Sequence, residues 1–182
     1  METVGVDRGD ESYLLEVGWI FTDWSIEPDW STLRHYPVRR ERPITPLWRL
    51  FPAHLRNHLM PESAPSSAAA RPAGDVIADL VADIGLVADE GHRIMLAGNS
   101  VGFDRAAILA HDPHAFDRLH YHIIDFSVLN EVVGAWYPSA LADAPTKDTD
   151  HRVSTCLRNS IERARWYRRL LSAGECGRSS SR

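Results

Sequence analysis

The stretch Ile94-Met95-Leu96-Ala97-Gly98-Asn99-Ser100-Val101-Gly102-Phe103-Asp104-Arg105 carries most of the information about the fold of this chain. Its first four residues form a short apolar run, which suits a strand, and the glycine, asparagine and serine that follow favour a loop. Asp104 then begins a helix that we expect over residues 105–110, before Pro113 stops it. The order of strand, loop and helix predicts one unit of an α/β domain.

The part of the chain before this stretch predicts two strands and a helix. Residues 13–21 (YLLEVGWIF) are rich in strand formers, and we expect a buried strand that carries Glu16. The alternation over 30–36 predicts a second strand. Ser, Ala and Pro dominate residues 61–73, which we interpret as a flexible connector within the domain. A surface helix is expected from about Gly74, where apolar residues recur at three- and four-residue spacing.

The part after the central stretch predicts one more strand and two helices. Residues 121–126 are expected to form the strand, and Ser127 is a suitable N-cap for a helix through residue 133. The last helix is expected over 153–171, with Gly174 ending it and residues 174–182 forming a disordered tail. Strands that alternate with helices indicate a single α/β domain over residues 1–173.

Composition and charge limit the class of protein. A chain of 182 residues with 44% hydrophobic residues is long enough to bury one core. No apolar run approaches the roughly 20 residues that a membrane span needs, so we expect no membrane association and a cytoplasmic location. The formal net charge of -5 argues against a protein that coats nucleic acid through charge alone. The two cysteines, Cys156 and Cys176, do not suggest a disulfide framework.

Four segments, in order along the chain, resemble the motifs of one enzyme family. Residues 1–5 (METVG) are similar to an Asp-x-Glu-Thr-x-Gly signature without its aspartate, and residues 98–105 (GNSVGFDR) resemble a GNSxGxDR motif. Residues 120–127 (HYHIIDFS) and the segment that begins at His151 complete the series. Together they resemble the oligoribonucleases, which are DEDDh 3′-to-5′ exonucleases. One signature alone is a weak signal, whereas four in the right order are specific.

The resemblance implies a fold, a reaction and a set of site residues. The fold would be ribonuclease-H-like, with a mixed sheet flanked by helices, here without the central strand at the N-terminus. The reaction would be the hydrolysis of short single-stranded RNA to mononucleotides with two Mg²⁺ or Mn²⁺ ions, by a homodimer in which Tyr121 reaches the neighbouring subunit. By position, the metal ligands would be Glu2, Asp104 and Cys156, the general base His151, and the substrate contacts Val6, His58, Ser100 and Tyr121.

Two departures from the family's pattern leave alternatives open. The first aspartate is absent, and one explanation is that the protein begins upstream of Met1. Cys156 stands where the family has its last aspartate, and a thiol is a poor ligand for Mg²⁺. The alternatives are a catalytically lapsed nucleic-acid-binding protein of the same fold, or an exonuclease of the same superfamily that acts on DNA. Glu16 is expected to be a surface residue or a partner of the site residues.

Overall fold

The described strands of this protein form two small sheets. The computed structural model describes residues 1–3, 14–39, 62, 64, 66–146 and 150–176. Within these residues an antiparallel sheet has the order β1-β2-β3, and a second sheet pairs β4 with β5 in parallel. The strands are β1 (Glu2–Thr3), β2 (Leu14–Trp19), β3 (Arg34–Pro37), β4 (Ile94–Gly98) and β5 (Leu119–Asp125).

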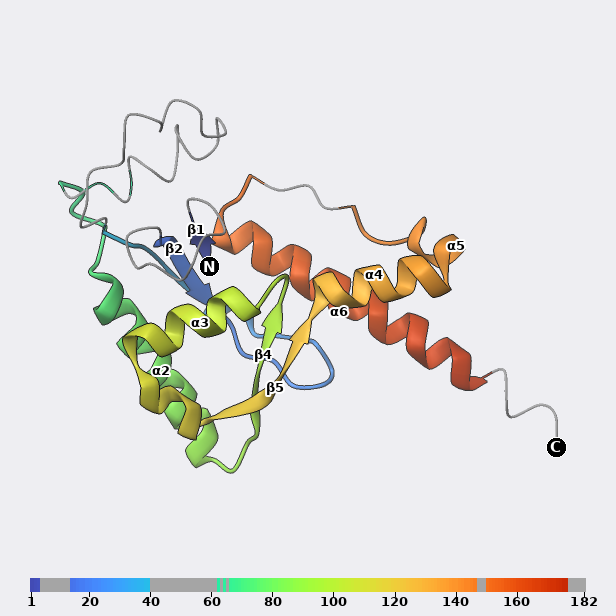
Figure 1. Ribbon diagram of the computed structural model, residues 1–182, viewed down its shortest axis with the longest axis horizontal. Helices are drawn as coiled ribbons and strands as arrows, with labels where there is room; N and C mark the ends of the chain where they lie inside the picture. Colours follow the sequence, from blue (N-terminus) through green and yellow to red (C-terminus); the bar gives the residue numbers. More distant parts are fainter. Residues whose placement is uncertain (4–13, 40–61, 63, 65, 147–149, 177–182) are drawn as a thin grey trace.

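Helices surround these strands on two sides (Figure 1). In the view of Figure 1, α2 and α3 lie on one side of β4 and β5, whereas α4 and α5 lie beside the long helix α6 on the other. Two short 3-10 helices, η2 (Trp30–Thr32) and η5 (Pro113–Asp117), complete the described elements. The α-helices are α2 (Ala73–Asp89), α3 (Gly102–His111), α4 (Phe126–Trp136), α5 (Pro138–Leu141) and α6 (Val153–Cys176).

Strand β2 is buried on both of its faces, as its apolar sequence predicts. Its two faces alternate along the chain, so that Glu16 and Gly18 face the start of α6 while Trp19 faces α2. Trp19 donates its indole N–H to Asp83 of α2 at 2.8 Å. A space for α6 exists because Gly18 has no side chain: a Cβ there would lie 2.4 Å from a methyl carbon of Val153.

Two apolar clusters of described residues hold the layers together. The larger cluster joins β2 to α2, α3 and β5, and its apolar positions on α2 follow the periodicity that predicted this helix. The smaller cluster joins α4 to α6. Fully buried members of the first include Val17, Val38, Val76, Ile77, Ile84 and Ile108, and buried members of the second are Phe126, Val133, Ala164, Trp166 and Tyr167.

Several expected boundaries are wrong, and local capping explains two of them. Residues 30–36 do not form one strand: Asp29 accepts the backbone N–H of Ser31 at 2.9 Å and starts η2, so that the strand is confined to β3. The N-cap of α4 is Asp125, not Ser127, because the Asp125 carboxylate accepts the Ser127 N–H at 2.9 Å. Helix α6 continues past Gly174 to Cys176.

The arrangement of strands also differs from the single mixed sheet that the resemblance implied. The described part of the chain is an α/β structure with both parallel and antiparallel pairs, but no described strand joins β1-β2-β3 to β4-β5. The end of the expected connector is held in place, since Ala70 is buried and Arg71 exchanges backbone hydrogen bonds with Pro37 and Arg39. None of the described helices is both long and apolar enough to cross a lipid bilayer.

Gly18→Ala tests the close approach of β2 to α6. We expect the alanine to lower the free energy of unfolding by about 1–3 kcal/mol, because the added carbon overlaps Val153 and lies 2.9 Å from the carbonyl oxygen of Arg34. The measurement is urea unfolding followed by circular dichroism. Gly74→Ala in α2, where the nearest atom is 3.9 Å away, is the control and should be neutral or stabilising. Equal effects at the two glycines would contradict this packing.

Candidate active site

The loop after β4 is fixed against the start of α4. Gly98, the last residue of β4, pairs with Asp125 at the end of β5. The backbone N–H of Ser100 donates to Asp125 Oδ1 and to Ser127 Oγ, each at 3.0 Å. Ser100 has a positive φ of 54°, which is uncommon for a residue other than glycine. The loop therefore presents Ser100, an expected substrate contact, in a defined position at the carboxyl end of a parallel strand pair.

Asp104 lies in the first turn of α3, directly after this loop. Its side chain is 24% exposed, and the amino group of Met1 donates to its Oδ1 at 2.5 Å. Glu2, the other expected carboxylate ligand, pairs through its backbone with Glu16 of β2, and its side chain lies outside the described residues.

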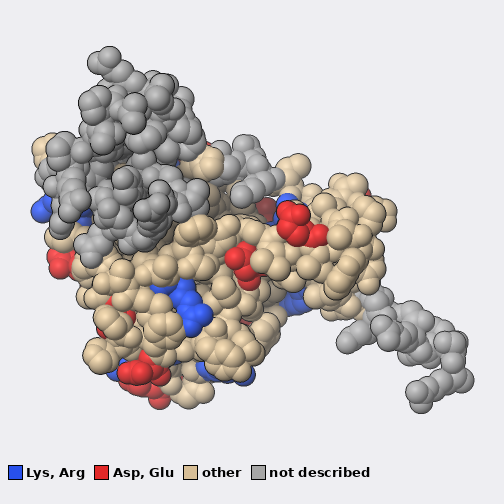
Figure 2. Space-filling view, in the orientation of Figure 1, with Lys and Arg blue, Asp and Glu red and all other residues tan. Residues whose placement is uncertain are grey.

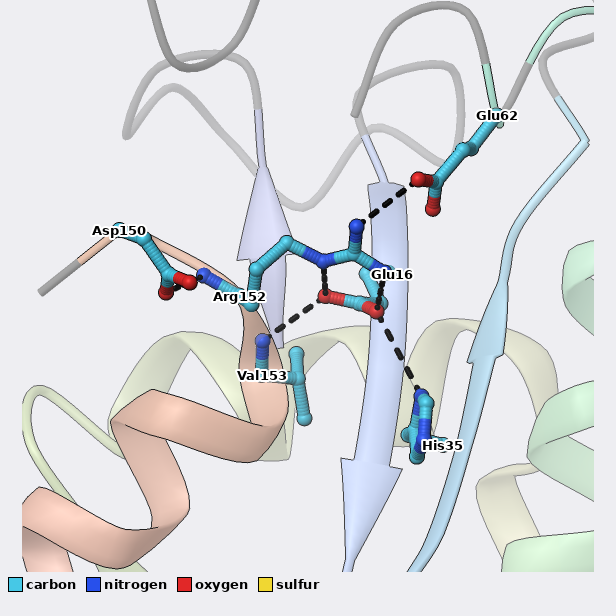
Figure 3. Close-up of polar contacts among 6 residues, drawn as sticks. All are labelled: Glu16, His35, Glu62, Asp150, Arg152 and Val153. Carbon is cyan, nitrogen blue, oxygen red and sulfur yellow. Dashed lines mark hydrogen bonds and ion pairs between the residues drawn. The ribbon is translucent and has the colours of Figure 1, made fainter. Parts of the chain in front are cut away.

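A buried carboxylate joins β2 to the start of α6 (Figure 3). Glu16 is only 1% exposed, and Arg152 donates to both of its oxygens, from Nη2 at 2.9 Å and from Nε at 3.3 Å. The backbone N–H of Val153 donates to Glu16 Oε2 at 2.8 Å, and His35 Nδ1 lies 3.6 Å from Oε1. Arg152 Nη1 also donates to Glu62 at 2.8 Å. Hydrogen bonds to Glu16 raise the pKa of Arg152, so the guanidinium remains charged.

The expected general base stands between two anchored neighbours. The carboxylate of Asp150 accepts the backbone N–H of Arg152 at 2.9 Å, and this hydrogen bond lowers the pKa of Asp150. His151 lies between these residues with a positive φ of 57°. Cys156 is half-buried in the first turns of α6, and its N–H donates to the carbonyl oxygen of Arg152 at 2.9 Å. Arg152 therefore connects β2, His151 and the Cys156 turn.

A polar pocket of about 250 Å³ lies between α4 and α6. It adjoins the Ser100 loop, because Asn99 and Ser127 form part of its wall. Asn159 and Arg163 line it from α6. Amide, hydroxyl and guanidinium groups of this kind can bind the polar parts of a nucleotide.

Of the remaining expected substrate contacts, the structure describes only Tyr121. Tyr121 lies on β5, is 67% exposed and packs beside the rings of His120 and His122. Val6 and His58 lie outside the described residues.

Among the described side chains, no three of His, Cys, Asp or Glu lie close enough to hold a metal ion. Among the residues that are coloured in Figure 2, acidic and basic side chains lie in small separate groups, without a broad field of one sign.

Sequence reasoning missed the structural role of Arg152 and Asp125, although it allowed Glu16 a role as a partner. A glutamate inside an apolar strand is the signal that could have led to the pair, because a buried carboxylate needs a partner. The identity of that partner is not visible from the sequence, since Glu16 and Arg152 are separated by 136 positions.

Comparison with known proteins finds oligoribonucleases among the relatives of this chain. No family model matches the chain. The chain is 40% identical over 88 residues to an oligoribonuclease of Streptomyces griseus. These 88 residues are 48% of this chain and 43% of that protein. It is 41% identical over 86 residues to the oligoribonuclease of Streptomyces avermitilis and 36% identical over 92 residues to that of Corynebacterium glutamicum. Each match covers 47–50% of this chain and 42% of the relative. The chain thus spans less than half the length of these curated relatives.

Asp150→Ala tests the turn that precedes α6. At neutral pH we expect a loss of about 1 kcal/mol in the free energy of unfolding, because the Arg152 N–H loses its acceptor. The folded-state pKa of Asp150 is below its ordinary value of 3.8, so this contribution is present above pH 3.8 and is lost as the pH falls below it. Urea unfolding at about pH 7 and at about pH 2.5 measures the difference.

The control for this experiment is Asp143→Ala, which removes an exposed carboxylate elsewhere. We expect it to change the stability by less than about 0.5 kcal/mol at either pH. An Asp150→Ala effect that is equally large at the two pH values would contradict the assigned hydrogen bond.

Proposed function

Homology over about half of its length relates this chain to the oligoribonucleases, and from this premise we propose that it is a metal-dependent 3′-to-5′ exonuclease. Its substrate would be short single-stranded RNA, which it would shorten to mononucleotides. The observation that carries the proposal is the 40% identity over 88 residues to a named oligoribonuclease. The fixed Ser100 loop, Asp104 and the constrained His151 support it from the structure.

Each site residue would have a specific task. Bound divalent ions would polarise the scissile phosphate and lower the pKa of the attacking water. Asp104 and Glu2 would hold these ions, and His151 would accept a proton from the water, a role that histidine often has in catalysis. Ser100 would contact the substrate from the loop after β4. The fold would be ribonuclease-H-like, with Glu2 in β1 of one sheet and with Ser100 and Asp104 directly after β4 of the other.

By the chemistry of the expected ligands, the site would suit Mn²⁺ better than Mg²⁺. Asp104 would supply a carboxylate oxygen, the kind of ligand that both of these hard divalent ions prefer. The third expected ligand position is Cys156, whose soft sulfur suits neither ion well and Mg²⁺ least. Asp104 and Glu2 are therefore the residues that would hold the ions, and the Cys156 position would weaken the site.

The substrate and the assembly are also part of this proposal. The polar pocket beside Asn99 and Ser127 would take polar groups of the RNA next to Ser100. The exposed ring of Tyr121 would reach the active site of a second copy of the chain, which requires a homodimer. Val6 and His58 would add substrate contacts, as the resemblance implies.

A second candidate function is a nucleic-acid-binding protein of the same fold that has lost catalysis. Cys156 favours it, because the family's aspartate at this position is replaced by a poor ligand. The constrained conformation of His151 favours the enzyme, since backbone strain at a residue other than glycine is concentrated at functional sites.

An RNA cleavage assay with two substitutions tests the proposal. Asp104→Ala should reduce Mn²⁺-dependent release of mononucleotides at least about 100-fold, because an ion is then held by too few carboxylates. Cys156→Asp should raise the Mg²⁺-dependent rate about tenfold or more by adding an oxygen ligand. Asp117→Ala, at an exposed position on η5, is the control and should have no effect.

Circular dichroism should show that all the variants remain folded. Cleavage that is unchanged in Asp104→Ala would contradict the proposed ligand. The wild type and Cys156→Asp could both be inactive with Mg²⁺ and with Mn²⁺ and still bind short RNA. That result would favour the nucleic-acid-binding protein.

A further inference from the structure

The backbone of His151 has a conformation that needs support from its surroundings. Its φ of 57° lies in the left-handed region, which residues other than glycine rarely adopt and which is unfavourable without external contacts. His151 is also the last residue but one before α6 begins at Val153. Whatever fixes residues 150 and 152 therefore fixes the histidine between them.

Hydrogen bonds fix both neighbours of His151, and these bonds connect the neighbours to one buried carboxylate, that of Glu16. Asp150 accepts the N–H of Arg152 across the histidine at 2.9 Å. Arg152 then donates twice to Glu16, which also accepts the N–H of Val153 at 2.8 Å. Figure 3 shows the Arg152 side chain and the Val153 N–H converging on Glu16 from the start of α6, while Asp150 binds the backbone N–H of Arg152. Because β2 is buried on both faces, Glu16 has little freedom to move.

Stability alone does not explain a charged pair at this place. Removing a carboxylate from water is costly, and apolar residues of similar size are often equally or more stabilising than a buried ion pair. An apolar pair has no directional contacts. The planar guanidinium of Arg152 donates to both oxygens of Glu16, and these two hydrogen bonds fix the orientation of the two side chains relative to each other. A general base requires such fixed geometry, since small displacements reduce the rate strongly.

We infer that Glu16 and Arg152 are positioning residues for His151, which hold it in its left-handed conformation at the start of α6. This inference rests on the proposed function, in which His151 accepts a proton from the attacking water. Neither residue needs to contact the substrate. Glu62 contributes by binding the remaining side of the guanidinium, at 2.8 Å from Nη1.

Arg152→Lys tests the inference, because it keeps the charge and removes the two-pronged contact. We expect kcat for short RNA to fall at least about tenfold while KM stays within about twofold, since the substrate contacts are untouched. Arg165→Lys is the matched control: Arg165 lies on the same helix and donates to Ile26 and Glu27. We expect it to leave kcat and KM unchanged.

A second measurement does not depend on activity. In protein labelled with ¹³C and ¹⁵N, the backbone chemical shifts and the HN–Hα coupling of His151 report its φ. We expect both to change in Arg152→Lys and to match the wild type in Arg165→Lys. Unchanged His151 signals in folded Arg152→Lys would overturn the inference, and so would changed signals with an unchanged kcat. An inactive wild type would refute the proposed function, and the signals of His151 would still decide whether Arg152 holds it.

Discussion

The burial of Glu16 is the constraint on which the rest of the structure depends. A carboxylate that is 1% exposed loses several kcal/mol of hydration, and it can remain in the core only with a charged partner and further hydrogen bonds. Arg152 and the N–H of Val153 satisfy this requirement. The requirement fixes the start of α6 against β2, where Gly18 leaves room for the helix. The positions of His151 and Cys156 follow from it.

Much of the fold could be predicted because local patterns decide it. The apolar run of β2, the spacing of apolar residues on α2 and the glycine-marked loop after β4 all led to the observed elements. The errors arose where one aspartate changed the local hydrogen bonding: Asp29 starts a 3-10 turn within an apparent strand, and Asp125 caps α4 in place of Ser127. Alternation and cap preference did not reveal which acceptor each N–H would use.

The candidate site could be predicted in part, and through its motifs more than through its contacts. The motif around Asp104 and the segment at His151 were recognisable from the residues. In the structure, Asp104 lies directly after the fixed Ser100 loop at the end of β4. The network that supports His151 was not predictable, because its two charged members lie 136 positions apart. Cys156 stands where the family has an aspartate, but the backbone at this position is regular helix, and its N–H donates to the carbonyl oxygen of Arg152.

The most direct test of this account is a double-mutant cycle between Glu16 and Arg152. The free energy of unfolding would be measured in urea for the wild type, Glu16→Gln, Arg152→Gln and the double variant. We expect each single change to destabilise the protein by about 2 kcal/mol or more, since each removes one partner of an ion pair whose carboxylate is buried and whose guanidinium is only 26% exposed. The double variant should lose at least about 1 kcal/mol less than the sum of the two. Strictly additive losses would show that the two side chains act independently and would contradict the account.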